Sequence, residues 1–210
     1  MKLILGFFGV CAVTVLIQFI SVSRSQTIAK RQIENTVGYV VFRHRGPDWL
    51  RKYLGDASPF KSPEEVCFGM KSTDDDLVLM ESFKQVKSVM LEGTHVKGPG
   101  LVHLRNLPRL EYIALTKSSI TDEGLGFLGA LRGLKHVGLA GSTITDQGVA
   151  HLAQLVHLEE LNLQNTKVTD RCLDYLRALP LNELRVRGTA ISPDGLTSLR
   201  KSNPNLRVYD

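Results

Sequence analysis

The fold is decided by the stretch LKHVGLAGSTITDQGVAHLAQLVH, residues 134–157. It opens with Val137 and Leu139 alternating with polar or small residues, which is the pattern of a short strand with one buried face. Three further apolar residues then recur at helical spacing: Val149, Leu152 and Leu155. One short strand and one short helix cannot bury their apolar faces alone, so copies of this unit must stack on one another.

The unit repeats in both directions along the chain. Copies superimpose on it at residues 86–109, 110–133 and 158–180, and a fifth runs over 181–205. A degenerate copy precedes them, because Thr73 and Asp74 stand two periods before the matching Thr and Asp of a later copy. We therefore assign residues 72–205 to the repeats and 206–210 to a C-terminal capping strand.

The shared pattern LxxLxLxxT followed by xITDxGLxxLxxL resembles leucine-rich repeat proteins of the TDxGL type. Together with WLRKYLG at residues 49–55, it resembles membrane-anchored bacterial leucine-rich repeat proteins, in which an apolar helix and a short cap precede the repeats. The resemblance implies an α/β fold, a right-handed solenoid with parallel strands on the concave face and helices on the convex face. We expect the N-terminal cap at residues 28–71, with a strand over 37–42 and a short helix over 48–55.

Two hydroxyl columns recur and suit structural roles. The first lies in the turn after the strand, and we expect its hydroxyls to bond the backbone of adjacent coils. The second precedes the helix, where a hydroxyl caps the helix and the aspartate that follows favours the helix dipole. The columns are Thr94, Ser118, Ser142, Thr166 and Thr189, and Thr121, Thr145, Thr169 and Ser192, with Asp122, Asp146 and Asp170 following the second.

A glycine column predicts close approach between coils. It comprises Gly100, Gly124, Gly148 and Gly195, and Cys172 occupies the same column in the fourth copy. A small buried thiol meets the same packing need, so we interpret Cys172 as structural. The chain's three cysteines are an odd, widely spaced set with neither disulfide nor metal-ligand spacing.

Residues 3–22 carry no charge and are long enough to cross about 30 Å of hydrocarbon as a helix. We predict a transmembrane or signal-anchor segment over residues 1–27, and thus a single-pass membrane protein. The excess of lysine and arginine after this segment favours cytoplasmic repeats. The alternative is a cleaved signal peptide, since Ser21 and Ser23 are small residues at inspected positions, and the protein would then be secreted or periplasmic.

The sequence predicts no catalytic, cofactor or metal site. Its six histidines do not converge on the repeat, and the aspartate column is explained by helix capping. The net charge of +5 is spread along the chain without interleaved aromatic residues, so no nucleic-acid partner is expected. A non-enzymatic role follows.

The candidate binding surface is the outward side of the strands, where side chains vary from copy to copy. A rigid sheet with varied side chains suits recognition of a protein partner. The alternative is a structural or assembly subunit of a larger membrane complex. The predicted contact residues are Ser88, Met90, Tyr112, Ala114, Thr116, His136, Glu160, Asn162, Gln164, Glu183, Arg185 and Arg187, with Glu92, Gly138 and Ala140 on the same side.

Overall fold

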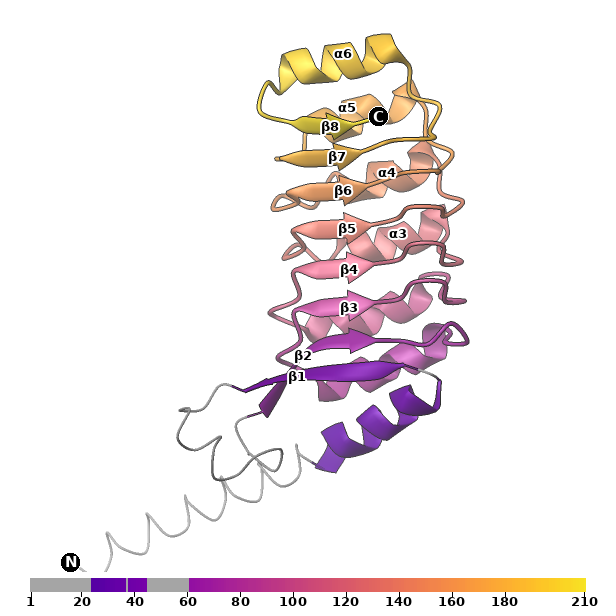
Figure 1. Cartoon of the computed structure of the whole chain (residues 1–210), viewed down its shortest axis with the longest axis vertical. Helices are drawn as coiled ribbons and strands as arrows, with labels where there is room; N and C mark the ends of the chain where they lie inside the picture. Colours follow the sequence, from indigo (N-terminus) through magenta and orange to yellow (C-terminus); the bar gives the residue numbers. More distant parts are fainter. Residues whose placement is uncertain (1–23, 37, 45–60) are drawn as a thin grey trace, which may run out of the picture.

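A computed structural model describes residues 24–36, 38–44 and 61–210. Its eight strands form one sheet in the order of the sequence (Figure 1). β1 pairs antiparallel with β2, and every later pair is parallel. The strands are β1 (Tyr39–His44), β2 (Lys61–Cys67), β3 (Ser88–Met90), β4 (Tyr112–Ala114), β5 (His136–Gly138), β6 (Glu160–Asn162), β7 (Glu183–Arg185) and β8 (Arg207–Tyr209).

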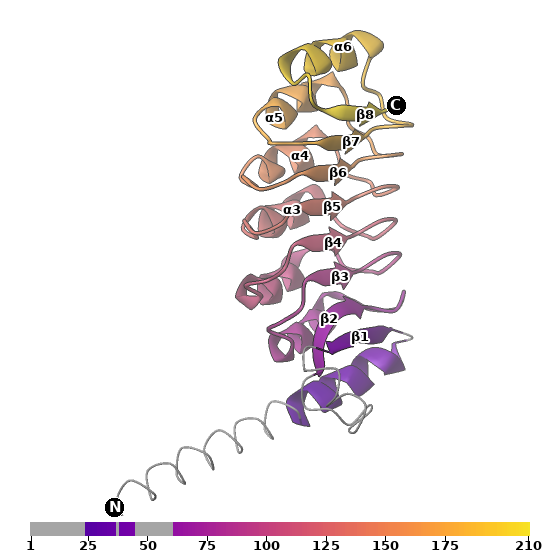
Figure 2. The ribbon, with the colours of Figure 1, turned by 60° about the vertical axis from the view of Figure 1, so that its left-hand side comes forward.

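A layer of helices runs along one side of the sheet (Figure 2). Three of these segments are 3₁₀ helices, and two of them, with nine and eight residues, are longer than 3₁₀ runs usually are. The helical segments are η2 (Asp74–Ser82), η3 (Pro99–Asn106), α3 (Asp122–Gly129), α4 (Asp146–Leu152), η4 (Asp170–Cys172), α5 (Leu173–Arg177) and α6 (Pro193–Ser202). A strand and a helix therefore alternate in each coil, which is a leucine-rich-repeat-like solenoid.

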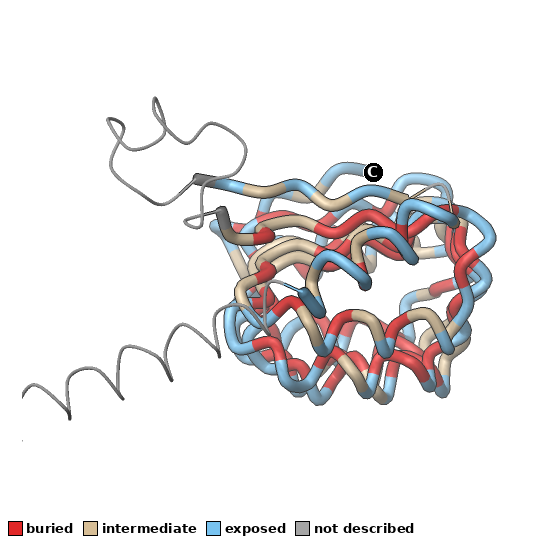
Figure 3. The backbone as a smooth tube through the Cα atoms, turned by 90° about the horizontal axis from the view of Figure 1, so that it is seen from below, coloured by how far each residue is buried: buried red, intermediate tan, exposed pale blue. Residues whose placement is uncertain are grey.

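One apolar core fills the space between the two layers (Figure 3). The central residues of successive strands point into it and stand in register, as Val89, Ile113 and Val137 do. Leu77, Met80 and Phe83 of the degenerate segment are fully buried in this core. Leu206 is buried and Val208 packs against the core, as predicted for the last strand.

The N-terminal end differs most from expectation. Residues 24–35 form a helix whose Ala29 and Ile33 are buried in the core. The expected strand exists but spans Tyr39–His44, while β2 was not predicted, because KSPEEVC lacks the alternation of a strand. Pro63 is tolerated in β2 because it pairs beside a register shift in β1.

Two predicted features fall outside the described residues: the apolar segment 3–22 and the short helix 48–55. Among the helices that the structure does describe, none has both the length and the apolar character needed to cross a membrane.

The first hydroxyl column bonds within its own coil, so the prediction of bonds to adjacent coils was wrong. Ser142 Oγ donates to the carbonyl of Leu139 at 2.7 Å, and Thr94, Ser118, Thr166 and Thr189 repeat this bond. The short side chain reaches the carbonyl three residues earlier more easily than the next coil. Backbone groups make the inter-coil bonds instead, as where the Gly93 N–H donates to the Thr116 carbonyl.

The second hydroxyl column caps the helices as predicted, and the aspartates beside it do more than favour the dipole. Thr145 Oγ1 accepts from the Gln147 N–H at 3.3 Å. Its own N–H and hydroxyl donate to the Asp122 carboxylate of the preceding coil, at 2.9 and 2.6 Å. Asp146 accepts the same two bonds from Thr169. We call this repeated link, from Asp122 to Thr145 and from Asp146 to Thr169, the aspartate ladder. Gly98 holds the aspartate position one coil earlier, and there Thr121 bonds the Lys97 carbonyl instead.

The glycine column confirms the predicted close approach. A Cβ on Gly124 would lie 2.1 Å from the Lys97 carbonyl oxygen, and one on Gly100 would lie 2.3 Å from the Asp74 carbonyl oxygen. Cys172 is fully buried, and burial raises its thiol pKa to about 12. The thiol is therefore protonated at neutral pH and serves as packing.

Candidate binding surface

The parallel register places outward side chains of successive strands in two rows. We call this side of β2–β8, with the turn residues that follow the strands, the strand face. The first row is Glu65, Ser88, Tyr112, His136, Glu160, Glu183 and Arg207. The second row is Cys67, Met90, Ala114, Gly138, Asn162, Arg185 and Tyr209.

The predicted contact residues lie together on this face. Those absent from the two rows stand in the turns two residues beyond the second row: Thr116, Gln164 and Arg187, with Glu92 and Ala140. Sequence reasoning omitted Glu65 and Cys67, because β2 was not expected. Arg207 and Tyr209 were also omitted, although the alternation with inward Leu206 and Val208 points them outward.

Two predicted contact residues are not available to a partner. Ala114 is only 1% exposed, and it carries a single methyl group between Met90 and Gly138 in its row. Glu183 is 8% exposed, because its carboxylate lies between the guanidinium groups of Arg185 and Arg207. Both residues therefore shape the strand face from beneath.

A hollow of about 150 Å³ opens in the middle of the strand face. Gly138 lies in its lining and has no side chain, while the side chains of Val137 and Leu161 are buried in the core beneath. The rings of Tyr112 and His136 stand beside each other, with centroids 6.0 Å apart and planes tilted by 36°. Glu92, Thr116, Glu160, Asn162, Glu183 and Arg185 complete the lining.

Carboxylates dominate the electrostatics of the hollow. Burial raises the pKa of Tyr112, and the charges of Glu92 and Glu160 raise it further, while Arg185 opposes them. His136 Nδ1 lies 3.3 Å from Glu160 Oε2. Toward β8 the balance changes, because Arg185 is paired with Glu183 and lies over the Tyr209 ring at 5.8 Å. The face is thus acidic over β2–β6 and basic over β7–β8.

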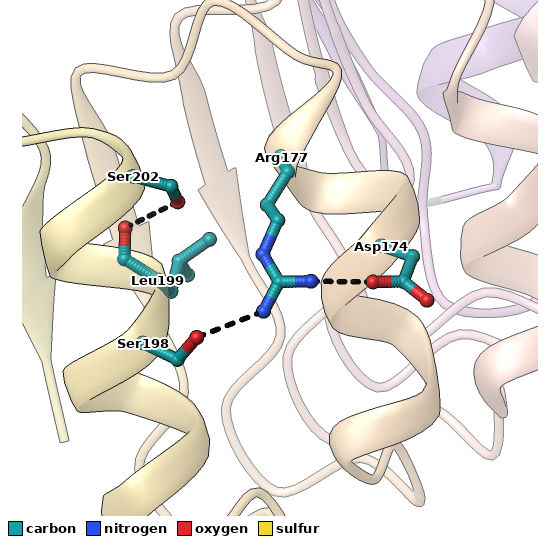
Figure 4. Close-up of polar contacts among 5 residues, drawn as sticks. All are labelled: Asp174, Arg177, Ser198, Leu199 and Ser202. Carbon is teal, nitrogen blue, oxygen red and sulfur yellow. Dashed lines mark hydrogen bonds and ion pairs between the residues drawn. The ribbon is translucent and has the colours of Figure 1, made fainter.

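The helical side carries polar contacts that link neighbouring elements. Arg177 of α5 donates to Ser198 of α6 at 3.1 Å and pairs with Asp174, while Ser202 bonds the Leu199 carbonyl (Figure 4). His103 Nδ1 lies 2.8 Å from Glu81. These are surface contacts of the kind that contributes little to stability.

The described part of the chain holds no group of three or more His, Cys, Asp or Glu side chains that could bind a metal ion. Cys67 on the strand face is buried, and burial raises its thiol pKa to about 11. The strand face carries aromatic, acidic and basic side chains that differ from one coil to the next.

No protein-family model matches the chain, and no curated protein matches it. Solved structures do, among them internalin C2 from Listeria monocytogenes, with a TM-score of 0.44 and 21% sequence identity. The match covers 62% of this chain and 54% of that one, so it spans about half the length of the internalin. The repeated strand-and-helix geometry of the chain itself shows the solenoid.

Proposed function

We propose that this chain is a non-enzymatic, membrane-tethered interaction module that binds a protein partner through its strand face. The observation that carries the proposal is the hollow, in which Tyr112, His136 and Glu160 from three successive strands meet around Gly138, which has no side chain. Aromatic side chains beside partly exposed polar groups on a rigid support are typical of protein recognition sites.

The tether rests on residues 3–22, whose uncharged run has the length of a membrane-spanning helix. Positive residues after the run favour a cytoplasmic strand face. If the segment is cleaved instead, the same module is released as a secreted or periplasmic binding protein. Extraction of membranes at alkaline pH and the mass of the mature N-terminus separate these cases, and protease accessibility of the repeats reports the side.

Photocrosslinking in native membranes tests the binding face. A photoreactive amino acid at Thr116, which lines the hollow, should yield an adduct of one defined mass. The same group at Tyr175 of α5, on the helical side, should not.

A triple variant then localises the contact. Tyr112→Ala, Glu160→Ala and Arg185→Ala together should abolish the adduct from Thr116. The matched control is Tyr175→Ala, Glu123→Ala and Arg171→Ala, three exposed residues of the same types away from the strand face. Circular dichroism verifies that both proteins are folded. An adduct that persists in the first triple variant would show that the partner binds elsewhere.

A further inference from the structure

The strand face has a charge pattern that selects one kind of partner. Glu65, Glu92 and Glu160 point to this side, and no lysine or arginine among the described residues forms an ion pair with any of them. Only His136 lies beside Glu160, with its Nδ1 3.3 Å from the carboxylate. The acidic half of the strand face, over β2–β6, therefore lacks a paired lysine or arginine. In the basic half, over β7–β8, Glu183 pairs with Arg185 and Arg207.

We propose that the hollow receives a lysine or arginine side chain of an extended segment of the partner protein. This inference rests on the proposed function and specifies its partner. Gly138 has no side chain and so leaves room in the hollow for the methylene stem of such a side chain. The charged head then lies beside the Tyr112 ring, between the carboxylates of Glu92 and Glu160.

The charges around Tyr112 agree with this assignment. Burial is the largest cause of the raised pKa of Tyr112, and the charges of Glu92, Glu160 and Glu65 raise it further, while Arg185 lowers it. Three carboxylates and one guanidinium thus act on the ring, an arrangement that favours a cation at the ring face.

The basic half determines the direction of the bound segment. Arg187 and Arg207 are exposed, and they lie two to three strands beyond the centre of the hollow. With strands about 4.8 Å apart and an extended chain rising about 3.3 Å per residue, this distance corresponds to roughly three to four residues. We expect an acidic residue of the partner about three to four positions from the lysine or arginine.

A randomised peptide library displayed on phage tests the proposal against the full-length protein in detergent micelles. Sequences that bind wild type but not the Tyr112→Ala variant define ligands of the strand face. They should share a lysine or arginine at one position, with Asp or Glu enriched about three to four positions away.

Charge variants test the recognition itself with one selected peptide. Glu92→Gln with Glu160→Gln should weaken its binding by at least about tenfold, because both carboxylates contact the cation. Glu123→Gln with Asp194→Asn removes the same charge elsewhere and should change binding less than about twofold. When the same library is selected for binding to the Glu92→Lys, Glu160→Lys double variant, the enriched peptides should carry an acidic residue in place of the lysine or arginine.

The outcomes separate this inference from the proposed function. Strand-face ligands without an enriched basic residue, or with affinity unchanged by Glu92→Gln and Glu160→Gln, would overturn the inference and leave the binding face standing. If no selected sequence depends on Tyr112, both the inference and peptide recognition by this face are wrong.

Discussion

The turn before each helix and the strand face are built from the same repeats, but they differ in how their residues recur. In the turn, a threonine followed by an aspartate recurs in three successive coils, and Asp122 and Asp146 bond the next coil in the same way. On the strand face, corresponding positions hold Tyr112, His136 and Glu160. Residues that repeat here maintain the solenoid, whereas residues that vary are free to define a binding surface.

A glycine-to-alanine pair gives the largest test of this comparison. Gly124→Ala should lower the free energy of unfolding by about 3 kcal/mol, because its Cβ would lie 2.1 Å from a backbone oxygen of the previous coil. Gly138→Ala on the strand face meets its nearest neighbour at 3.6 Å and should change stability by less than about 0.5 kcal/mol. Urea titration measures both. Equal losses would show that the strand face is packed as tightly as the turn.

The aspartate ladder gives the next effect. Asp146→Ala should cost about 2 kcal/mol, because the Thr169 N–H and hydroxyl lose their acceptor. The control is Asp174→Ala, whose side chain is 81% exposed and paired only at the surface, and it should cost less than about 0.5 kcal/mol. If Asp146→Ala is as stable as Asp174→Ala, the aspartate ladder does not stabilise the solenoid.

The buried thiol of the glycine column predicts a loss of stability at alkaline pH. Burial raises the pKa of Cys172 from 9.0 to about 12, so the unfolded chain ionises first as the pH rises. The contribution of the protonated Cys172 thiol to the free energy of unfolding is present below pH 9, and it should fall by about 1 kcal/mol between pH 9 and pH 10. The free energy of unfolding, measured for wild type and for Cys172→Ala at both pH values, isolates the contribution of this thiol. A difference between the two proteins that stays constant with pH would contradict it.

The smallest effect concerns the strand face alone. Glu92→Gln with Glu160→Gln should lower the pKa of Tyr112, because two carboxylates that disfavour the phenolate are removed. Carbon-13 NMR of labelled tyrosine, assigned with Tyr112→Phe, follows the titration. The Glu123→Gln variant should leave this pKa unchanged. A Tyr112 pKa insensitive to the double variant would show that the two carboxylates do not act on the hollow.

The repeat was sufficient to predict that the coils stack, and its recurring threonine, aspartate and glycine columns predicted the helix caps and the close approach between coils. It also placed Tyr112, His136 and Glu160 on one side of the sheet, since strand residues alternate between faces. β2 escaped prediction, because KSPEEVC gains its strand form from the paired β1 and β3 rather than from its own pattern.

Contacts between coils were decided by the tertiary structure. Asp146 and Thr169 are 23 residues apart, and only the stacking of coils shows that the carboxylate bonds the next cap. The same stacking buries Ala114 and Glu183 and opens the hollow beside them. The repeat pattern specifies on which face of the sheet a side chain lies. The packing of the neighbouring coils determines how much of that side chain stays exposed to a partner.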